Sequence, residues 1–536
     1  MRTFALLILL LCAGFGTPAR AALDAELVRQ LAAEDSDQKL AAIGQLSGGS
    51  TDRELLRRVL QAMSEDNLYT LKGQIFFVEA DKAFDATTGQ SLAQRPDNAE
   101  GVVANNRIRA ELDTRLAAYR LASPDRQTRL EAAQVLQDSG VDGSLIPLLE
   151  EALAKETDGQ IKPLIALAHA QASLQSDDPA KRIAAVKSLG ESDNPNVKNL
   201  LLGVLAKNGD QWAEPDEKVR HEADLALHAV QSRISRAEML GRVFSGISLG
   251  SILLLASMGL AITYGVMGVI NMAHGEFLMI GAYASYVVQG LFRSHYPGLV
   301  DYYVLAAIPV AFVAAALVGM ALERLVIRHL YGRPLETLLA TWGISLCLIQ
   351  AARLIFGPQN VEVANPTWLS GGLDLSAGVI LPANRIAIIA FSAGVLALMW
   401  GLMNLTRLGM FVRAVTQNRP MAGCVGVPTG RVDTLAFGLG AGIAGLGGVA
   451  LSQIANVGPD MGQGYIVDAF MVVVLGGVGQ MAGAVWAALG LGVVTKFLEG
   501  WAGAVVAKIL VLVIIVVFIQ KRPQGLFALK GRFVDS

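Results

Sequence analysis

The hydrophobic pattern divides this chain into two parts. Up to about residue 240, apolar residues recur three and four positions apart among many polar ones, as at Leu27 and Leu31 or at Leu56, Val59 and Leu60. This spacing places apolar side chains on one face of a helix. The remainder consists mostly of apolar runs of about 17–25 residues, the length that crosses a bilayer. The pattern predicts an all-α protein in which a helical domain precedes a polytopic membrane bundle.

The second part contains nine apolar segments that we expect to be membrane helices. The segment 465–479 is the shortest of them, and a re-entrant segment there would change the number of crossings. The nine are 243–263, 269–292, 302–326, 335–356, 380–405, 433–456, 465–479, 483–500 and 503–520.

The first part contains a weak internal repeat. Asp35, Ser123-Pro124-Asp125 and Ser176-Asp177-Asp178-Pro179 each precede a helical pattern with small residues on its packing face. Stacked helix pairs of this kind resemble HEAT-like solenoids. Leu68–Gln90 interrupts the repeat with aromatic and β-branched residues, which predicts a short β-hairpin.

The first residues predict an exported N-terminal domain. A basic start, a short apolar core and Ala19-Arg20-Ala21 form a signal-peptide pattern with cleavage after Ala21; a first membrane anchor is the alternative. We therefore expect a signal peptide over 1–21, a periplasmic helical domain over 22–236 and a transmembrane domain over 237–536. Cys347 and Cys424, the cysteines beyond the signal peptide, lie in a membrane segment and a loop, so no disulfide is expected.

The loop charges predict the orientation of the membrane part. Arginines gather between the fifth and sixth segments with no acid between the first and the last of them, and short basic loops stay in the cytoplasm. The loops predicted to lie outside are acidic instead. The signal peptide, which places residue 240 outside, and the loop charges agree that the C-terminus lies in the cytoplasm; the family resemblance given below implies a bacterial inner membrane. The arginines are Arg407, Arg413, Arg419 and Arg431, and the outer acids are Asp301, Glu362, Asp374 and Asp460.

This basic loop is also a candidate docking surface. Its sequence predicts a short helix over Met410–Asn418, followed by Pro420 and small residues that let another protein approach. The net charge of −2 gives no bulk field that suggests nucleic acid.

Small residues are dense in the sixth apolar segment. Gly438, Gly442, Gly445 and Gly448 lie on neighbouring faces of one helix. Such faces let helices pack closely. Tight static packing explains any single pair, whereas the abundance of small residues over several helices favours a bundle that moves.

Polar residues at membrane depth are candidate pathway residues. Asn271 and His274 share a helix face, and Glu276 joins them only if Gly268 and Gly275 allow the helix to break. Bonds between neighbouring helices are an equally good interpretation. Other candidates are Gln453 and Asp468, whereas Lys496 and Glu499 are spaced to pair on one helix and Asp433 is expected to cap or begin its helix.

Three motifs in the membrane part resemble one family. Gly268–Tyr283 (GVINMAHGEFLMIGAY), the pattern RAVxxNxxxAxxxG from Arg413 to Gly426, and Val472–Ala484 (VVVLGGVGQMAGA) are similar to LivH-type permeases, the membrane subunits of ABC importers for branched-chain amino acids and related solutes. In the first part, Asn105–Asp113 and Ser123–Ala133 resemble the urea-transporting permeases of this family. The resemblance, not the residue chemistry, implies urea.

The resemblance also implies partners. It implies a second permease subunit, two cytoplasmic ATPase subunits and a periplasmic solute-binding protein. By the same likeness, Arg413, Asn418, Ala422 and Gly426 belong to the loop that couples to an ATPase. The sequence contains no GxxxxGK[ST] phosphate-binding loop of its own, and we expect no cofactor, metal site or catalytic residues.

Other functions remain open at this point. The nearest keeps the importer and changes its solute from urea to branched-chain amino acids. A passive solute channel would need no ATPase. An anchored interaction scaffold fits poorly with so many crossings, and an intramembrane enzyme would need a catalytic motif such as HExxH, which the sequence lacks.

Overall fold

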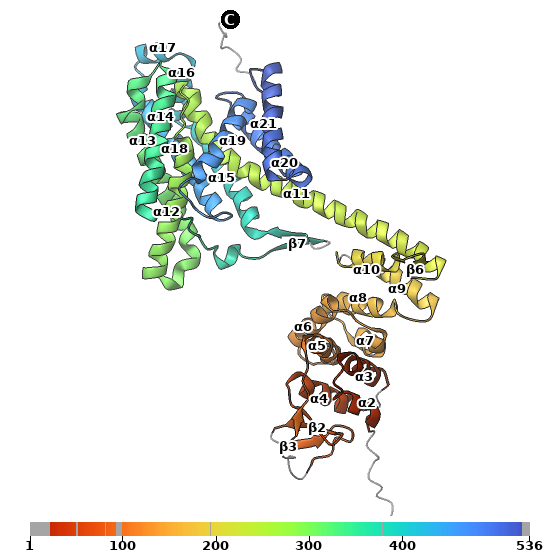
Figure 1. The fold of residues 1–536 in the computed structure, drawn as a ribbon. Coiled ribbons are helices and arrows are strands. Elements are labelled where there is room, and N and C mark those ends of the chain that lie inside the picture. Colours follow the sequence, from red (N-terminus) through yellow and green to blue (C-terminus); the bar gives the residue numbers. More distant parts are fainter. Residues whose placement is uncertain are drawn as a thin grey trace, which may run out of the picture. The chain divides into compact units, whose positions relative to one another are not determined.

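A computed structural model describes residues 22–49, 52–80, 82–92, 99–192, 194–376 and 379–527. The predicted signal peptide lies outside the described residues. The chain forms two compact units, Met1–Ile234 and Ser235–Ser536, and the 51-residue helix α11 (Glu217–Met267) contributes residues to both. The predicted fold class, a membrane helix bundle preceded by a helical domain, is confirmed (Figure 1).

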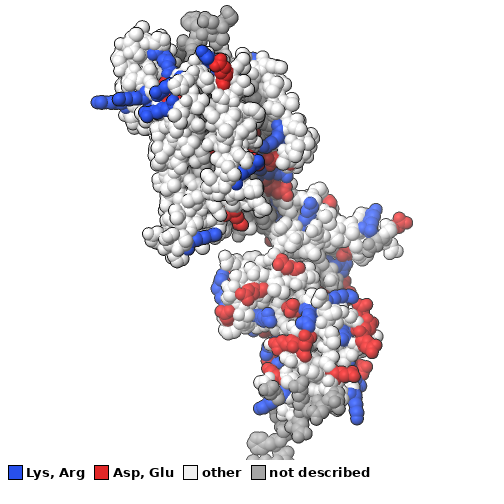
Figure 2. Space-filling model, turned by 60° about the vertical axis from the view of Figure 1, so that its left-hand side comes forward, with Lys and Arg blue, Asp and Glu red and all other residues white. Residues whose placement is uncertain are grey.

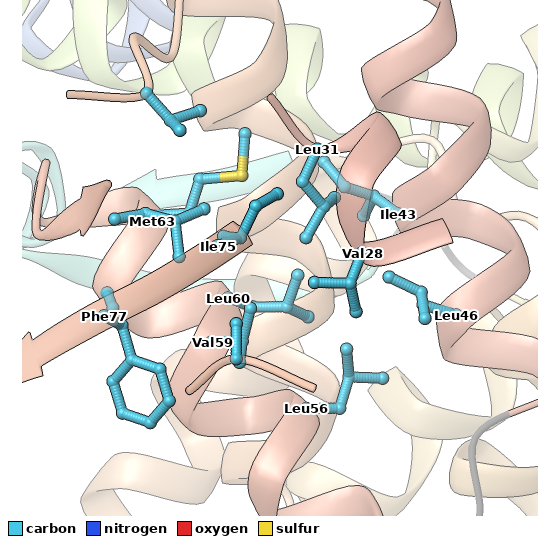
Figure 3. Close-up of a cluster of buried hydrophobic side chains, with 14 of the residues drawn as sticks. Val28, Leu31, Ile43, Leu46, Leu56, Val59, Leu60, Met63, Ile75 and Phe77 are labelled. Atoms are coloured by element: carbon cyan, nitrogen blue, oxygen red, sulfur yellow. The ribbon is translucent and has the colours of Figure 1, made fainter. Parts of the chain in front are cut away.

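The first unit is a stack of helices. One cluster of its core combines side chains from neighbouring helices and two strands, among them Leu31, Leu56, Met63 and Phe77 (Figure 3). Its helices are α2 (Ala25–Gln30), α3 (Ser36–Gly49), α4 (Arg53–Ser64), α5 (Asn106–Arg120), α6 (Arg126–Asp138), η1 (Gly143–Leu145), α7 (Ile146–Lys155), α8 (Ile161–Ser173), α9 (Pro179–Glu191) and α10 (Val197–Val204).

The predicted hairpin is part of a larger antiparallel sheet. β1 (Leu68–Leu71), β2 (Gln74–Glu79), β3 (Lys82–Asp85) and β4 (Glu100–Gly101) pair in the order β3-β2-β1-β4. Lys72 and Gly73 both have positive φ and form the two-residue turn that joins β1 to β2. β4 was missed because a two-residue strand has no periodicity of its own. A short pair, β5 (Lys207–Asn208) and β6 (Gln211–Trp212), precedes α11.

Arginines near the starts of two helices, α6 and α9, join parts of the stack. Arg129 of α6 donates to the carbonyls of Ser123 and Pro124 and, at 2.8 Å, to Glu156. Arg182 of α9 repeats this arrangement with the carbonyls of Ser176 and Asp177 and with Glu214. Each arginine therefore fixes the loop before its own helix to the loop before a later one, in two of the three copies of the weak sequence repeat.

The second unit contains the helices expected to cross the membrane. It begins with the end of α11. It continues with α12 (His274–His295), η2 (Pro297–Tyr302), α13 (Tyr303–Leu325), η3 (Ile327–Leu330), α14 (Pro334–Phe356), η4 (Thr367–Leu369), the hairpin β7 (Gly372–Ser376) and β8 (Val379–Pro382), α15 (Ala383–Leu405), α16 (Arg407–Gln417), α17 (Arg419–Cys424), α18 (Thr429–Ser452), α19 (Met461–Gly476), α20 (Met481–Ala502) and α21 (Ala504–Lys521).

Each of the nine predicted segments falls on a helix, but not all nine have the length and apolarity of a span. Among the described residues, seven helical stretches meet both conditions, and they include α11, α13 to α15, α18, α20 and α21. α19 has only 16 residues. α12 carries His274 and Glu276 in its first turn and Arg293 in its last, so its ends are polar.

Helix α18 forms the centre of this bundle. Its apolar stretch is 89% buried, against 17% for α21. Small residues set its contacts: a Cβ on Gly445 would lie 2.8 Å from the carbonyl oxygen of Ala311 in α13, one on Gly440 would lie 2.6 Å from the carbonyl oxygen of Gly259 in α11, and one on Gly448 would overlap the Leu278 carbonyl of α12. Since three helices meet α18 at backbone distance, larger side chains are excluded there.

The outer helices present a mostly uncharged surface. Large apolar side chains such as Leu339, Leu398, Trp400 and Ile509 are exposed on α14, α15 and α21. Figure 2 shows largely white atoms over the helix bundle, whereas acidic and basic residues are interspersed over the first unit. Exposed apolar area of this extent is typical of a surface covered by lipid or by a partner subunit.

Candidate functional site

A break in the helix lies between α11 and α12. α11 ends at Met267, Gly268 has a φ of +65°, and helical structure resumes only at His274. Asn271 lies in the break and is buried, with its Oδ1 accepting the Ala273 N–H at 3.0 Å. Thr341 of α14 accepts the Met272 N–H at 3.1 Å. Part of the freed backbone thus bonds to side chains, as non-helical segments at membrane depth require.

His274 and Glu276 point to different neighbours at the start of α12. His274 Nε2 lies 2.8 Å from the Ala256 carbonyl oxygen of α11, and its ring packs edge-on against Phe277. The Glu276 carboxylate accepts the Ser345 hydroxyl of α14 at 2.8 Å. The two side chains therefore make separate helix–helix contacts. Although they are only two residues apart in the sequence, they do not share a hydrogen-bonded centre.

The break concentrates unpartnered polar atoms. Asn271 Nδ2, His274 Nδ1 and Glu276 Oε2 are buried and have no hydrogen-bond partner among the described residues. Buried polar atoms without a partner are rare in proteins and call for a physical explanation. Three of them within six residues, at a discontinuous membrane helix, provide hydrogen-bonding capacity for a small polar solute.

Gln453 lies in a second polar cluster, after the end of α18. Its Nε2 donates to Tyr303 Oη and to Ser452 Oγ, both at 3.1 Å, and Tyr303 donates to the Ala364 carbonyl at 2.9 Å. Asn384 of α15 bonds the Gln453 carbonyl. Gln453 therefore joins α13, α15 and α18, and its side-chain bonds are made within the protein.

Asp468 has a partner that its own helix does not supply. Its carboxylate lies 3.6 Å from Lys508 Nζ of α21, and both side chains line a cavity of about 240 Å³. The spacing of Lys496 and Glu499 predicts a pair, and this prediction is confirmed at 2.5 Å. The Asp468 cavity is separate from the helix break that contains Asn271.

The basic loop forms two short helices, α16 and α17, at one end of the bundle (Figure 1). Arg413 donates to the Met403 carbonyl at 2.6 Å, and Asn418 caps α17 by accepting the Met421 N–H. Ala422 is buried, and Gly426 has a φ of +86° that only glycine adopts without strain. Among the exposed residues beside them are two large apolar ones, Met421 and Val425, which are 59% and 71% exposed.

A buried charged network behind these helices was not predicted from the sequence. Asp433 pairs with Arg419 of α17 rather than capping α18, whose N-cap is Pro428. Glu323 of α13 is fully buried and accepts the Thr434 hydroxyl at 2.7 Å, with Arg328 3.6 Å away. The sequence signal was present: two acids beside predicted span ends, each with an arginine on a nearby loop.

Comparison with known proteins places the membrane part in a family. The sequence pattern of the family described as "Branched-chain amino acid transport system / permease component" matches residues 242–519. No solved structure matches the chain.

The relatives align along nearly their whole length. The high-affinity branched-chain amino acid transport system permease protein LivH of Salmonella typhimurium is 30% identical over 293 residues, which cover 54% of this chain and 94% of that protein. BraD of Pseudomonas aeruginosa, with the same description, is 29% identical, covering 54% and 95%. A probable LivH of Methanocaldococcus jannaschii is 25% identical, covering 52% and 88%. The chain belongs to the family of branched-chain amino acid transport system permease components.

Proposed function

We propose that this chain is a membrane-spanning subunit of an ATP-driven importer of branched-chain amino acids. The observation that supports this most directly is the family match, because it covers residues 242–519 and therefore nearly all of the membrane helices. The names of the relatives favour branched-chain amino acids over urea, the solute implied by the resemblance of the first part.

The proposed partners are a second permease subunit, two cytoplasmic ATPase subunits and a periplasmic solute-binding protein. α16 and α17 form the proposed ATPase contact. Two exposed apolar side chains, Met421 and Val425, lie beside the exposed Arg413 and Asn418, and such a mixture suits a protein interface. The Arg419–Asp433 pair joins α17 to the central helix α18, so force applied to α17 reaches the bundle.

The proposed solute pathway includes Asn271, His274 and Glu276, with Gln453 and Asp468 as further candidates. The three unpartnered atoms at the helix break support the first group. Gln453 is the weaker candidate, because its amide already bonds Tyr303 and Ser452. Gly438, Gly442, Gly445 and Gly448 are proposed to allow close packing of α18 during transport.

Urea is the second candidate solute. One observation favours it: the buried, unpartnered Asn271 Nδ2 offers a neutral amide donor of the kind that bonds urea.

Uptake of labelled leucine and labelled urea tests the proposal. Cells that express this chain with the complete set of neighbouring transporter subunits should accumulate leucine, and excess urea should not compete. Accumulation of urea without competition by leucine would replace the proposal with the second candidate. Entry of either solute without the ATPase subunits would indicate a passive channel instead.

The substitution Asn271→Asp tests the pathway. It retains the oxygen that accepts the Ala273 N–H and replaces the unpartnered Nδ2, so the turn can form while the free donor is lost. We expect uptake to fall about tenfold, the effect of losing one good hydrogen bond to a bound solute, with unchanged amounts in the membrane. Asn199→Asp, an exposed amide on α10 of the first unit, is the control. Unaltered uptake by Asn271→Asp would remove Asn271 from the pathway.

A further inference from the structure

The cavity around Asp468 combines charged and apolar walls. It has a volume of about 240 Å³ and lies among α11, α19, α20 and α21. Leu249, Leu253 and Leu491 form part of its apolar wall. Its polar side chains are Tyr465, Asp468, Thr495, Lys496, Glu499 and Lys508. A space of this size accommodates about eight water molecules at the volume of liquid water, or one small organic molecule.

The cavity contains two carboxylates and two lysine ammonium groups, and the two acid–lysine pairs differ in distance. Lys496 and Glu499 form a close pair at 2.5 Å between neighbouring turns of α20. Asp468 and Lys508 come from α19 and α21 and lie 3.6 Å apart, beyond the usual 2.7–3.2 Å of an N–H···O hydrogen bond. Asp468 and Lys508 therefore form a looser ion pair than Lys496 and Glu499 do, and the Lys508 side chain is 61% exposed.

We propose that this cavity binds a zwitterion. An ammonium group of the ligand would bond Asp468 and an acidic group would bond Lys508, while an apolar part lies against the leucine wall. The two ion pairs of the cavity already sum to zero charge, so a ligand with both charges keeps the cavity neutral, whereas a simple cation or anion would add one uncompensated charge. A neutral ligand such as urea supplies neither charge.

This inference rests on the proposed function and makes it more specific. A branched-chain amino acid has an ammonium group, a carboxylate and an apolar side chain, which are the three features that the cavity walls complement. The headgroup of phosphatidylethanolamine has the same pair of charges. The test therefore separates a solute from a lipid as the source.

Binding of labelled leucine to the purified full chain in phosphatidylglycerol nanodiscs tests the site. We expect Asp468→Asn and Lys508→Gln each to weaken binding about tenfold or more, since each leaves one charge of the ligand unpaired. Matched controls are Asp210→Asn in the first unit and Lys521→Gln at the end of α21, both exposed and outside the cavity lining. Excess urea should not displace leucine.

A cavity-filling substitution gives a readout that does not depend on charge. Gly464 lines the cavity, and a Cβ there would meet nothing within 4 Å, so Gly464→Leu fits the backbone and occupies the space. Gly394→Leu on α15 has the same free surroundings and lies outside the cavity. Only Gly464→Leu should abolish leucine binding, even if a charge variant proves unstable.

Native mass spectrometry after incubation with phosphatidylethanolamine vesicles tests whether the cavity binds a lipid headgroup instead. A bound phosphatidylethanolamine that is lost in the Asp468, Lys508 and Gly464 variants, without leucine binding, would identify the headgroup as the zwitterion. If neither ligand binds, or both bind the variants as well as the wild type, the site is overturned. If cells take up leucine but the variants bind it as well as the wild type, the cavity site is overturned and the proposed transport function stands. If cells take up urea and the cavity binds the lipid headgroup, the proposed function is overturned and the zwitterion site stands.

Discussion

At the scale of single residues, two buried acids determine how the docking helices join the bundle. Asp433 and Glu323 are fully buried, and each faces an arginine from a neighbouring loop, Arg419 and Arg328. Arg419 also lies 4.7 Å above the ring of Tyr331. A buried acid is tolerated only while its partner stays in place. A displacement of α17 that separates Arg419 from Asp433 would therefore destabilise α18.

A double-mutant cycle measures this coupling. Arg419→Met should destabilise the purified protein by about 3 kcal/mol, because it leaves the Asp433 charge buried and unpaired. The double variant Arg419→Met/Asp433→Leu should recover most of that loss. Thermal unfolding followed by tryptophan fluorescence checks both, with the exposed Arg431→Met as control. Additive losses in the double variant would show that the two side chains do not stabilise each other.

At the scale of elements, the sequence predicted where the helices lie along the chain better than which helices contact one another. Apolar runs located nine helices of the second unit, seven of which have the length and apolarity of a span among the described residues, and the helical stack of the first unit. Periodicity cannot show which helix a polar residue will face, so the separate contacts of His274 and Glu276 and the Asp468–Lys508 pair needed the structure. The four-stranded sheet was underestimated because β4 joins it from fifteen residues further along the chain.

The substitution Gly448→Ala tests the packing of α18 directly. A Cβ at this position would overlap the Leu278 carbonyl oxygen and lie 2.8 Å from the Ala282 nitrogen, so α12 and α18 would have to separate. Gly394→Ala adds the same methyl group on α15, where nothing lies within 4 Å. We expect only Gly448→Ala to reduce the yield of monodisperse protein, measured by size-exclusion chromatography at equal expression. Equal yields would mean that the helices have room to adjust.

At the scale of the whole molecule, the orientation in the membrane remains a prediction from loop charge. Cys424 is exposed on α17, and Cys347 is exposed on α14. If α16 and α17 face the cytoplasm, a membrane-impermeant maleimide should label Cys424 in a Cys347→Ser background only after cells are permeabilised. Labelling in intact cells would invert the orientation and would exclude α17 as the contact for a cytoplasmic ATPase.

The whole-molecule description also shows where sequence reasoning stops. Three motifs identified the family, since residues 268–283, 413–426 and 472–484 all lie inside the matched region. The same motifs do not identify the solute, because affinity for a solute depends on which side chains lie close together in the folded protein. Asn271 and Asp468, both proposed from the sequence, lie in two different places in the bundle, and they offer different chemistry, a neutral amide and a carboxylate paired with a lysine.

The crowding around α18 has a consequence for how this protein tolerates mutation. Nineteen residues of α18 are buried, and many are glycine or alanine pressed against neighbouring backbone, whereas α21 exposes most of its apolar stretch. Saturation mutagenesis should therefore find α18 almost intolerant of any gain in volume, while α21 accepts exchanges among apolar residues. Amino-acid substitutions in such a protein would accumulate during evolution in exposed helices such as α21, and the central helix α18 would change little.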